Sequence, residues 1–597
     1  MIAIFIDHKL QRYENQIKFA FNFIFRTLGY EYKFASNQKE IGKHDIVFYY
    51  AETELSDKGK LQLGKDRLLC FIPCFKELLI PGKIPKTKLR EYTQQINIGD
   101  PLPIICDWQF RNPIIYLKNE QVFYVKFHFD LLANVFFNLC NYETVNAERD
   151  SLGRIPDSEY LHHDFFYYPY VNAMLWFIEQ VLKDAVTRSG RCFLTKKEMW
   201  PAAQDYGFAV SHQLDRLQKW TVGRFFKSFF KDLLLIIHVK YVCKNLYSKL
   251  KYILTNIEEY WNFDEIEEIE NETEFKSTFF LGSEHENEYD VDYDLDDRDL
   301  LEELERIEKQ NKEIALLGSY QSAKSDILSH QKHSISQLIN KHKIGIRQIC
   351  FRYFPEFTAE YHYKHSFFYD SSQTLLTRPG FKCGIALPYH PYAVNDATEL
   401  IPKLALVRDT ILELPLAFRA SSLKKSPFSI IEKQEAKKLF NHTIKGVKQY
   451  GGFYSMDFTC ADFAEIDYLK GFYSEILQQV DKDNCYKATY KQIADWWKKR
   501  ENVQITDSKD DIIIHFPDHL PEFVLTIVGN NSFDSVENDK NREDENQIFL
   551  PYYDKQNTFE FNGTKVKFAK DRIFFSEIKP DTRLRIKLSK KEIEKEA

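Results

Sequence analysis

Polar side chains that could take part in chemistry follow several apolar runs of this sequence. His212 and Asp215 end the run around residues 209–212, and Arg347 and Asp370 each end a later run. Carboxylates and imidazoles can bind a metal or transfer protons. Most carboxylates at strand ends are simply hydrogen-bonded, so Asp215 is a weak metal candidate and His212 is interpreted as a packing histidine. A pair between Arg347 and Asp370 at the barrel mouth is one option for these two residues, and His212, Asp215, Arg347 and Asp370 are the candidates for a polar ligand cleft.

Complete motifs for a structural metal or a bound nucleotide do not occur. The closest two of the ten cysteines, Cys70 and Cys74, have no matching second pair, so no zinc site is expected. The acidic run 290–301 lacks the glycine and final glutamate of a calcium loop, because Leu295 and Leu301 stand there. No phosphate-binding Gly-rich loop or nucleophile elbow appears. Scattered cysteines are typical of reduced thiols, and we expect a cytoplasmic protein.

The composition is that of a large globular protein. The 597 residues are 44% hydrophobic and 28% charged, and at about 150 residues per domain they predict three or four domains. The net charge of 81 − 88 = −7 argues against nucleic acid as a partner. No apolar run reaches the ~18 residues of a membrane-spanning helix. The start, Met1–Leu10, lacks a basic leader and reads as a strand rather than a signal peptide.

Three regions follow from the periodicity of the apolar residues. Over residues 1–195, buried strands such as Ile2–Ile6 alternate with amphipathic helices such as Gln16–Leu28, which predicts an N-terminal α/β domain. The alternation of strands and helices continues over 196–503 and indicates a parallel sheet or barrel. Residues 504–597 contain strand patterns only and predict a C-terminal β-sandwich.

Two charged segments stand out in the middle region. The stretch 216–261 predicts a basic helical insert: nine Lys or Arg stand against one acid up to Lys251, a net of +8. The segment 264–308 has 20 acids and three bases, and we interpret it as the solvated faces of a folded domain. The basic insert is either a solvated helical face or a surface for an anionic membrane or an acidic protein. The surface candidates are Lys219, Arg224, Lys227, Lys231 and Lys240.

A family resemblance rests on stretches that occur in one order along the chain. They are Phe129–Ala133, Tyr142–Glu143, Asp150–Arg154, Ser211–Asp215, Phe275–Phe280, Glu313–Tyr320, Ile346–Arg352, Tyr369–Ser372, Gly380–Gly384, Glu413–Pro415 and Gly451–Phe458. Together they resemble the polysaccharide deacetylases of carbohydrate esterase family 4, in the long bacterial branch with an extra N-terminal α/β domain. The resemblance spans roughly residues 1 to 500 and implies a distorted (β/α) barrel of that type for the middle region.

The resemblance also implies a catalytic site, which this sequence does not preserve. In the family an aspartate and two histidines hold a divalent metal, usually zinc, a second aspartate acts as base and a late histidine as acid. Asp215 keeps the ligand position. The other positions, in chain order, are Gln213, Leu317, Ile349 and Thr459. Glutamine cannot accept a proton at neutral pH, and one carboxylate does not hold zinc.

The expected function is therefore that of a catalytically inactive deacetylase-like protein. It would serve as a binding or scaffold module near cell-envelope glycan assembly, without a cofactor. The alternative is an active, zinc-dependent deacetylase or hydrolase with a site rearranged around Asp215, Asp370 and Arg347. Partners under the first hypothesis are a protein, an anionic membrane surface or a glycan. Peripheral attachment to the inner membrane is the second option beside a cytoplasmic location.

Overall fold

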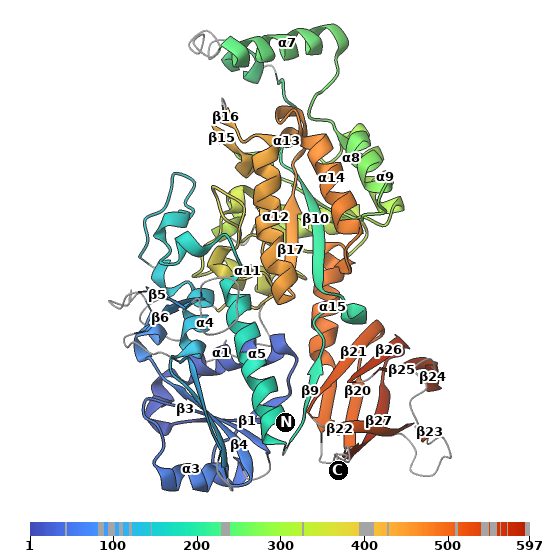
Figure 1. Ribbon diagram of the computed structural model, residues 1–597. Helices are drawn as coiled ribbons and strands as arrows, with labels where there is room; N and C mark the ends of the chain where they lie inside the picture. Colours follow the sequence, from blue (N-terminus) through green and yellow to red (C-terminus); the bar gives the residue numbers. More distant parts are fainter. Residues whose placement is uncertain are drawn as a thin grey trace.

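Figure 1 shows the computed structural model of the chain, with the helices and strands coloured along the sequence. It describes residues 1–597 except 42–43, 82–88, 93–101, 107–111, 119–121, 145, 191, 222, 229–238, 325–326, 393–410, 427–428, 508–510, 530, 539–547, 550–557, 562, 570 and 591–597.

The N-terminal α/β region, which we call the front domain, is built on a six-stranded sheet in the order β2-β1-β3-β4-β8-β7. Its strands are β1 (Ile2–Ile6), β2 (Tyr32–Phe34), β3 (Ile46–Ala51), β4 (Arg67–Pro73), β7 (Ile114–Lys118) and β8 (Val122–Phe127). Neighbouring strands are parallel except β7, which is antiparallel to β8. The short strands β5 (Leu89–Tyr92) and β6 (Leu102–Ile105) pair with each other beside it.

Helices cover both faces of this sheet. They are α1 (Glu14–Leu28), α2 (Gln38–Ile41), α3 (Asp57–Gly64), α4 (Leu131–Cys140) and α5 (Tyr170–Ser189). Side chains alternate between the faces of a strand, so β3 sends Phe48 into the large core with α1 and Val47 into a smaller core that includes Leu63 of α3. Burial on both faces explains why β3 is continuously apolar.

The middle region contains a curled, parallel sheet in the order β13-β12-β11-β10-β17-β14, with β18 paired to β10. Its strands are β10 (Tyr206–Leu214), β11 (Thr278–Leu281), β12 (Glu313–Gly318), β13 (Ile346–Gln348), β14 (Phe418–Arg419), β17 (Phe453–Asp457) and β18 (Cys485–Lys487). Single bridges from Ile346 to Asp370 and from Asp370 to Glu413 continue the curl beyond β13. The segment after Glu413 runs into β14, so the sheet curls round on itself as in a barrel.

Helices surround the curled sheet (Figure 1). They are α8 (Phe263–Asn271), α9 (Arg298–Lys309), α10 (Leu328–Leu338), α11 (Thr358–Lys364), α12 (Lys433–Tyr450), α13 (Cys460–Glu465), α14 (Leu469–Asp481) and α15 (Tyr490–Asn502). A two-stranded sheet, β15 (Lys424–Ser426) with β16 (Ser429–Ile430), precedes α12. The helix α7 (Val239–Thr255) lies at one end of the molecule, away from the rest of the barrel.

Two five-stranded antiparallel sheets form the C-terminal region. One contains β19 (Gln504–Asp507), β20 (Asp511–Phe516), β22 (Asn531–Asn538), β23 (Ile548–Phe549) and β27 (Thr582–Lys590); the other contains β9 (Leu194–Lys197), β21 (Leu520–Val528), β24 (Thr558–Phe561), β25 (Thr564–Ala569) and β26 (Arg572–Ile578). The ring of Phe516 on the first sheet lies 5.3 Å from those of Phe523 and Phe575 on the second. The sheets therefore pack face to face as a sandwich.

The predicted fold class is confirmed: the chain is mixed α/β, with a curled parallel sheet beside further sheets. One detail departs from a simple serial arrangement. Strand β9 lies at the predicted end of the front domain, yet it pairs with β21 of the sandwich. Periodicity along the chain reports that a strand exists and carries no information about its partner. The boundaries at residues 195 and 503 stay predictions.

Candidate functional site

The carboxyl ends of the parallel strands bring several of the predicted site residues to one edge of the barrel. Gln213 lies near the end of β10 and Asp215 directly follows it. The Oε1 atom of Gln213 and the Oδ1 atom of Asp215 are buried and accept no hydrogen bond from the described residues. Burial raises the pKa of Asp215 to about 7, and the charges of Asp462 and Asp457 add to the shift. A carboxyl group that titrates near neutrality therefore sits at this edge.

His212 lies on β10 with both ring nitrogens engaged. Nδ1 is 2.9 Å from the carbonyl oxygen of Phe458, and Nε2 is 2.9 Å from Oε1 of Glu270. Glu270 also accepts from Lys312 at 2.7 Å and from the hydroxyl of Tyr473 at 2.7 Å. Burial raises the pKa of Glu270, but the contacts with His212 and Lys312 outweigh it and hold the value at about 2. His212 is thus a buried, fully bonded group.

Arg347 lies on β13 and is fully buried. Its guanidinium pairs with Asp457 of β17, with 2.5 Å between Nη1 and Oδ1, and donates to Ser211 at 3.0 Å. Its Nε and Nη2 atoms donate to the carbonyl and hydroxyl oxygens of Ser371, each at 3.1 Å. The charge lies 4.0 Å from the ring centroid of Phe280. Arg347 therefore ties β10, β13 and β17 together within the barrel.

The predicted pairing of Asp370 with Arg347 is wrong. Asp370 instead receives a hydrogen bond from Nδ1 of His362 at 2.7 Å, and both side chains are fully buried. The Nε2 atom of His362 lies 2.8 Å from the amide nitrogen of Gln348. The carboxyl group of Glu413 faces Asp370, and burial and that neighbouring charge raise the pKa of Glu413 well above its usual value.

Three of the four positions at which the resemblance expects catalytic residues have structural roles. Leu317 on β12 and Ile349 after β13 are 1% and 3% exposed and belong to the main hydrophobic core. Thr459 caps α13: its hydroxyl accepts from the backbone N–H of Asp462, and the Asp462 side chain accepts from the N–H of Thr459. The threonine thus satisfies a helix N-terminus. Gln213 is the position left with an unbonded acceptor.

The donor set at this edge does not fit a zinc ion. Zinc sites need three or four nitrogen, sulfur or carboxylate ligands. Asp215 is the carboxylate at the position where the resemblance expects a ligand, and the buried Leu317 and Ile349 stand where it expects histidines. Within the described ranges, no group of three or more His, Cys, Asp or Glu is placed to hold a metal.

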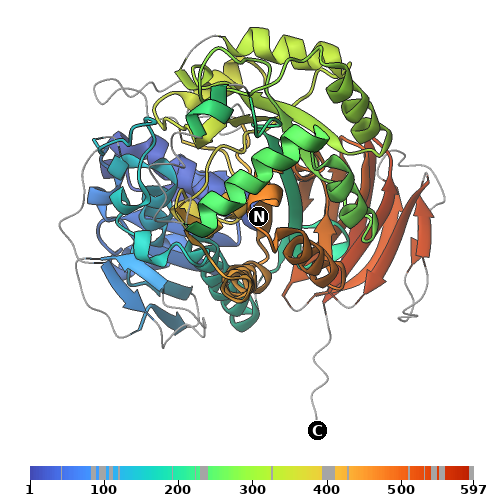
Figure 2. The same ribbon diagram turned by 90° about the horizontal axis from the view of Figure 1, so that it is seen from above.

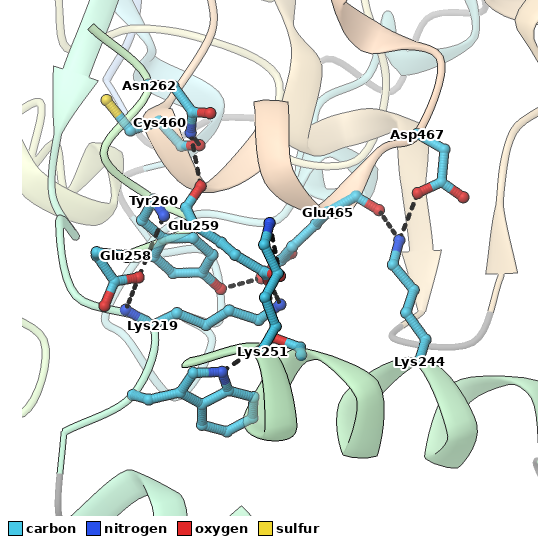
Figure 3. A network of polar contacts seen from close by, with 12 residues as sticks. Lys219, Lys244, Lys251, Glu258, Glu259, Tyr260, Asn262, Cys460, Glu465 and Asp467 are labelled. Atoms are coloured by element: carbon cyan, nitrogen blue, oxygen red, sulfur yellow. Dashed lines mark hydrogen bonds and ion pairs between the residues drawn. The ribbon is translucent and has the colours of Figure 1, made fainter. Parts of the chain in front are cut away.

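The basic insert was the second predicted site. Lys219 pairs with Glu259, with 2.5 Å between Nζ and Oε2 (Figure 3). Arg224 pairs with Asp292 at 2.6 Å. Lys227 is exposed. Lys231 and the side chain of Lys240 lie outside the described part of the chain. At least two of the five predicted surface cations are therefore neutralised by acids of this same chain.

Helix α7 is held to the barrel by contacts on one of its sides (Figure 3). The Nζ atom of Lys244 lies 2.6 Å from Asp467. The hydroxyl of Ser248 accepts from Nε1 of Trp220 at 2.9 Å and donates to Glu259 at 2.7 Å. The amide of Asn262 donates to the carbonyl oxygen of Cys460 at 2.9 Å. This bond anchors the segment between α7 and α8, which also contains Glu259, to α13.

Several residues that define the site were missed as candidates: Glu270, His362, Glu413 and Asp457. Two of them had a signal in the sequence, because Glu413 and Asp457 lie in stretches that carry the family resemblance. Glu270 had none, since it lies in an acid-rich helix where one glutamate looks like its neighbours. His362 lies on a short helix whose pattern did not reveal its buried side.

A family model described as a family of unknown function (DUF7033) matches residues 6–187, which lie within the N-terminal domain predicted over 1–195. No curated protein matches the chain. A protein from Mycobacterium smegmatis, provisionally described as a polysaccharide deacetylase, is similar in structure at 16% identity and TM-score 0.33, over 52% of this chain and 96% of its own. A provisionally described polysaccharide deacetylase from Pseudomonas aeruginosa PAO1 shares 11% identity at TM-score 0.34, over 50% and 92%. Puue allantoinase shares 11% at TM-score 0.33, over 50% and 92%.

Proposed function

We propose that the barrel is a catalytically inactive relative of polysaccharide deacetylases that serves as a binding or scaffold module in cell-envelope glycan assembly. The observation that supports this proposal is the use of the former catalytic positions. Leu317 and Ile349 are core residues, and Thr459 caps a helix. A side chain that fills the core is not available to a substrate. The neighbouring His212 has both ring nitrogens bonded, so it does not replace a lost ligand.

The alternative is a hydrolase with a rearranged site, and one observation favours it. The carboxyl group of Asp215 has a pKa of about 7, which suits a general base or acid near neutral pH. Its Oδ1 atom accepts no hydrogen bond from the described residues.

Metal content and hydrolysis together separate the two proposals. We expect well under one equivalent of zinc in the dialysed protein and no hydrolysis of acetylated chitooligosaccharides or acetyl esters above background. Gln213→Asp alone should restore neither. Stoichiometric zinc, or a hydrolysis rate that falls in Asp215→Asn but not in the matched control Asp57→Asn, would establish the alternative. Asp57 is the control because its side chain is fully exposed, far from the barrel edge.

A further inference from the structure

The outer face of α7 is apolar and exposed. Leu246, Leu250 and Ile253 are 49%, 50% and 63% exposed, and Val239 and Leu254 are 64% and 81% exposed. Tyr247 and Ile257 are also exposed, at 69% and 54%. Single exposed apolar residues are ordinary on a protein surface, but a contiguous group of them marks an interaction site. We call this set the α7 apolar face.

The spacing of these residues places them on one side of the helix. Positions 239, 246, 250 and 253 recur every three, four or seven residues, and Cys243, which is exposed, lies on the same line. Ile257 lies beyond the end of α7 at Thr255. At 100° per residue, Tyr247 and Leu254 widen this line to an arc of about 120°. The face is thus a broad band along the whole helix.

The opposite side of α7 is fixed to the barrel, which determines the direction of the apolar face. Ser248 and Lys249 are each 2% exposed. The Nζ atom of Lys249 lies 5.2 Å from the ring centroid of Trp220, whose Nε1 bonds Ser248. The helix cannot turn its apolar face inward without breaking these contacts and the Lys244–Asp467 pair.

Helix α7 also lies at an extremity of the molecule. It is the end of the structure at the top of Figure 1, and in Figure 2, which is seen from above, the same green helix lies across the middle of the picture in front of the other elements. A flat surface can therefore approach it along its length.

We propose that α7 is an interfacial anchor that lies flat on an anionic phospholipid bilayer, with the α7 apolar face inserted among the headgroups and acyl chains. Lys244 and Lys251 border this face, and their side chains are 44% and 39% exposed although each also faces an acid of the same chain, Asp467 at 2.6 Å and Glu259 at 3.9 Å. Lysines beside an apolar band can extend to the headgroup region and attract anionic lipid. The exposed Lys227 adds charge at the same end. This anchor is independent of whether the barrel catalyses a reaction.

A second copy of the chain is a less suitable occupant. The 3.5-residue repeat resembles a coiled-coil seam, but a 17-residue helix offers little more than two heptads. The band is wider than such a seam, because Tyr247 and Leu254 lie to one side of the line formed by the other residues and are also exposed. Pairing two copies would also bring lysines of like charge together. A bilayer with anionic headgroups has the complementary charge.

Sedimentation of the full chain with vesicles tests the anchor. The probes are vesicles of phosphatidylcholine mixed with phosphatidylglycerol, and vesicles of phosphatidylcholine alone. We expect binding to the mixed vesicles, weaker binding to the neutral ones, and a decrease as salt is raised. The triple variant Leu246→Ser, Leu250→Ser, Leu254→Ser should bind at least about tenfold more weakly. Leu61→Ser with Leu117→Ser is the matched control, because these leucines are 42% and 52% exposed elsewhere.

A fluorophore sensitive to polarity, attached to Cys243, reports insertion without removing any apolar residue. We expect its emission to shift to the blue with mixed vesicles, and Cys243→Ser measures labelling of the other cysteines. The proposal is overturned by absence of vesicle binding, by equal binding of the triple variant, or by sedimentation without a blue shift. If the wild-type chain forms a dimer without lipid and the triple variant is monomeric, the occupant of the α7 apolar face is a second copy of the chain and not a bilayer. If the triple variant does not fold, the emission shift of the wild-type chain labelled at Cys243 still tests insertion into the bilayer.

Discussion

Arg347 and Asp457, on strands β13 and β17, form an ion pair inside the barrel in which neither side chain is more than 3% exposed. A buried pair contributes little relative to an apolar replacement of both residues, but removing one partner leaves a charge in a poorly solvated place. The pair therefore makes the barrel sensitive to single substitutions at either position.

The first prediction concerns this pair. Arg347→Met should lower the free energy of unfolding by about 3–5 kcal/mol, because the carboxylate of Asp457 loses its counter-charge. Urea unfolding followed by circular dichroism measures the effect. Arg347→Met combined with Asp457→Asn should recover part of the loss. An unchanged urea midpoint in the single variant would contradict the buried pair.

The second prediction concerns acid stability. Glu270 has a pKa of about 2 in the folded protein, against 4.5 for an ordinary glutamate. Its stabilisation is therefore complete above pH 4.5 and is lost as the pH falls toward 2. Glu270→Gln should flatten the dependence of the unfolding free energy on pH in that window. Glu272→Gln, at an exposed position two residues on, is the control and should leave the slope as in the wild type.

The third prediction has the opposite sign. The pKa of Asp215 is raised from 3.8 to about 7, so folding favours the neutral form. This contribution is complete below pH 3.8 and is lost as the pH rises through 7. Asp215→Asn should therefore be more stable than the wild type at pH 8, by about 1–2 kcal/mol after allowance for partial solvent exposure. No gain is expected at pH 3.8 or below. Thermal melting at both pH values measures the difference; a loss of stability at pH 8 would contradict it.

The fourth prediction concerns the junction of the front domain with the rest of the chain. Arg500 of α15 is fully buried, and burial lowers its pKa to about 10. It donates to the carbonyl oxygens of Arg26 and Thr27 at the end of α1, and to those of Lys197 and Glu198 beside β9. Gly29, with φ of 82°, permits this approach, since a Cβ there would lie 2.6 Å from Nη2 of Arg500. The arginine thus fastens α1 to β9.

Arg500→Met should destabilise the protein by about 2–4 kcal/mol, because the buried carbonyl oxygens lose their donors. We also expect calorimetry to show the front domain melting separately from the remainder. Arg298→Met is a control, as its side chain is 90% exposed. A single transition at the wild-type temperature would show that this junction does not depend on Arg500.

Much of the fold was predictable because it follows from local periodicity. The helix expected over Gln16–Leu28 is α1, the strand expected at Ile2–Ile6 is β1, and the apolar run around residue 209 belongs to β10. Each pattern is complete within a few turns or residues. The partner of β9 was not predictable, since a strand of four residues carries no mark of the strand it joins, in which Leu525 pairs with Lys197 across 525 − 197 = 328 residues.

The candidate site was predictable only in part. The resemblance pointed to Gln213, Leu317, Ile349 and Thr459, and sequence alone established that these residue types do not bind zinc. The present roles of three of these residues, in the core or at a helix N-terminus, became visible only in the packing of the tertiary structure. Asp370 pairs with His362 rather than Arg347 because the curl of the sheet decides which side chains meet.

For the basic insert, the sequence by itself determined an amphipathic helix rich in lysine. Which side of that helix faces outward was decided by the tertiary structure. Lys219 and Lys244 find their counter-charges in Glu259 and Asp467, which lie 40 and 223 residues further along the chain. Those ion pairs and the buried Ser248 hold the polar side inward, so the apolar side remains in contact with solvent. The physical reason is that periodicity is local, whereas the choice of an ionic partner depends on the whole fold.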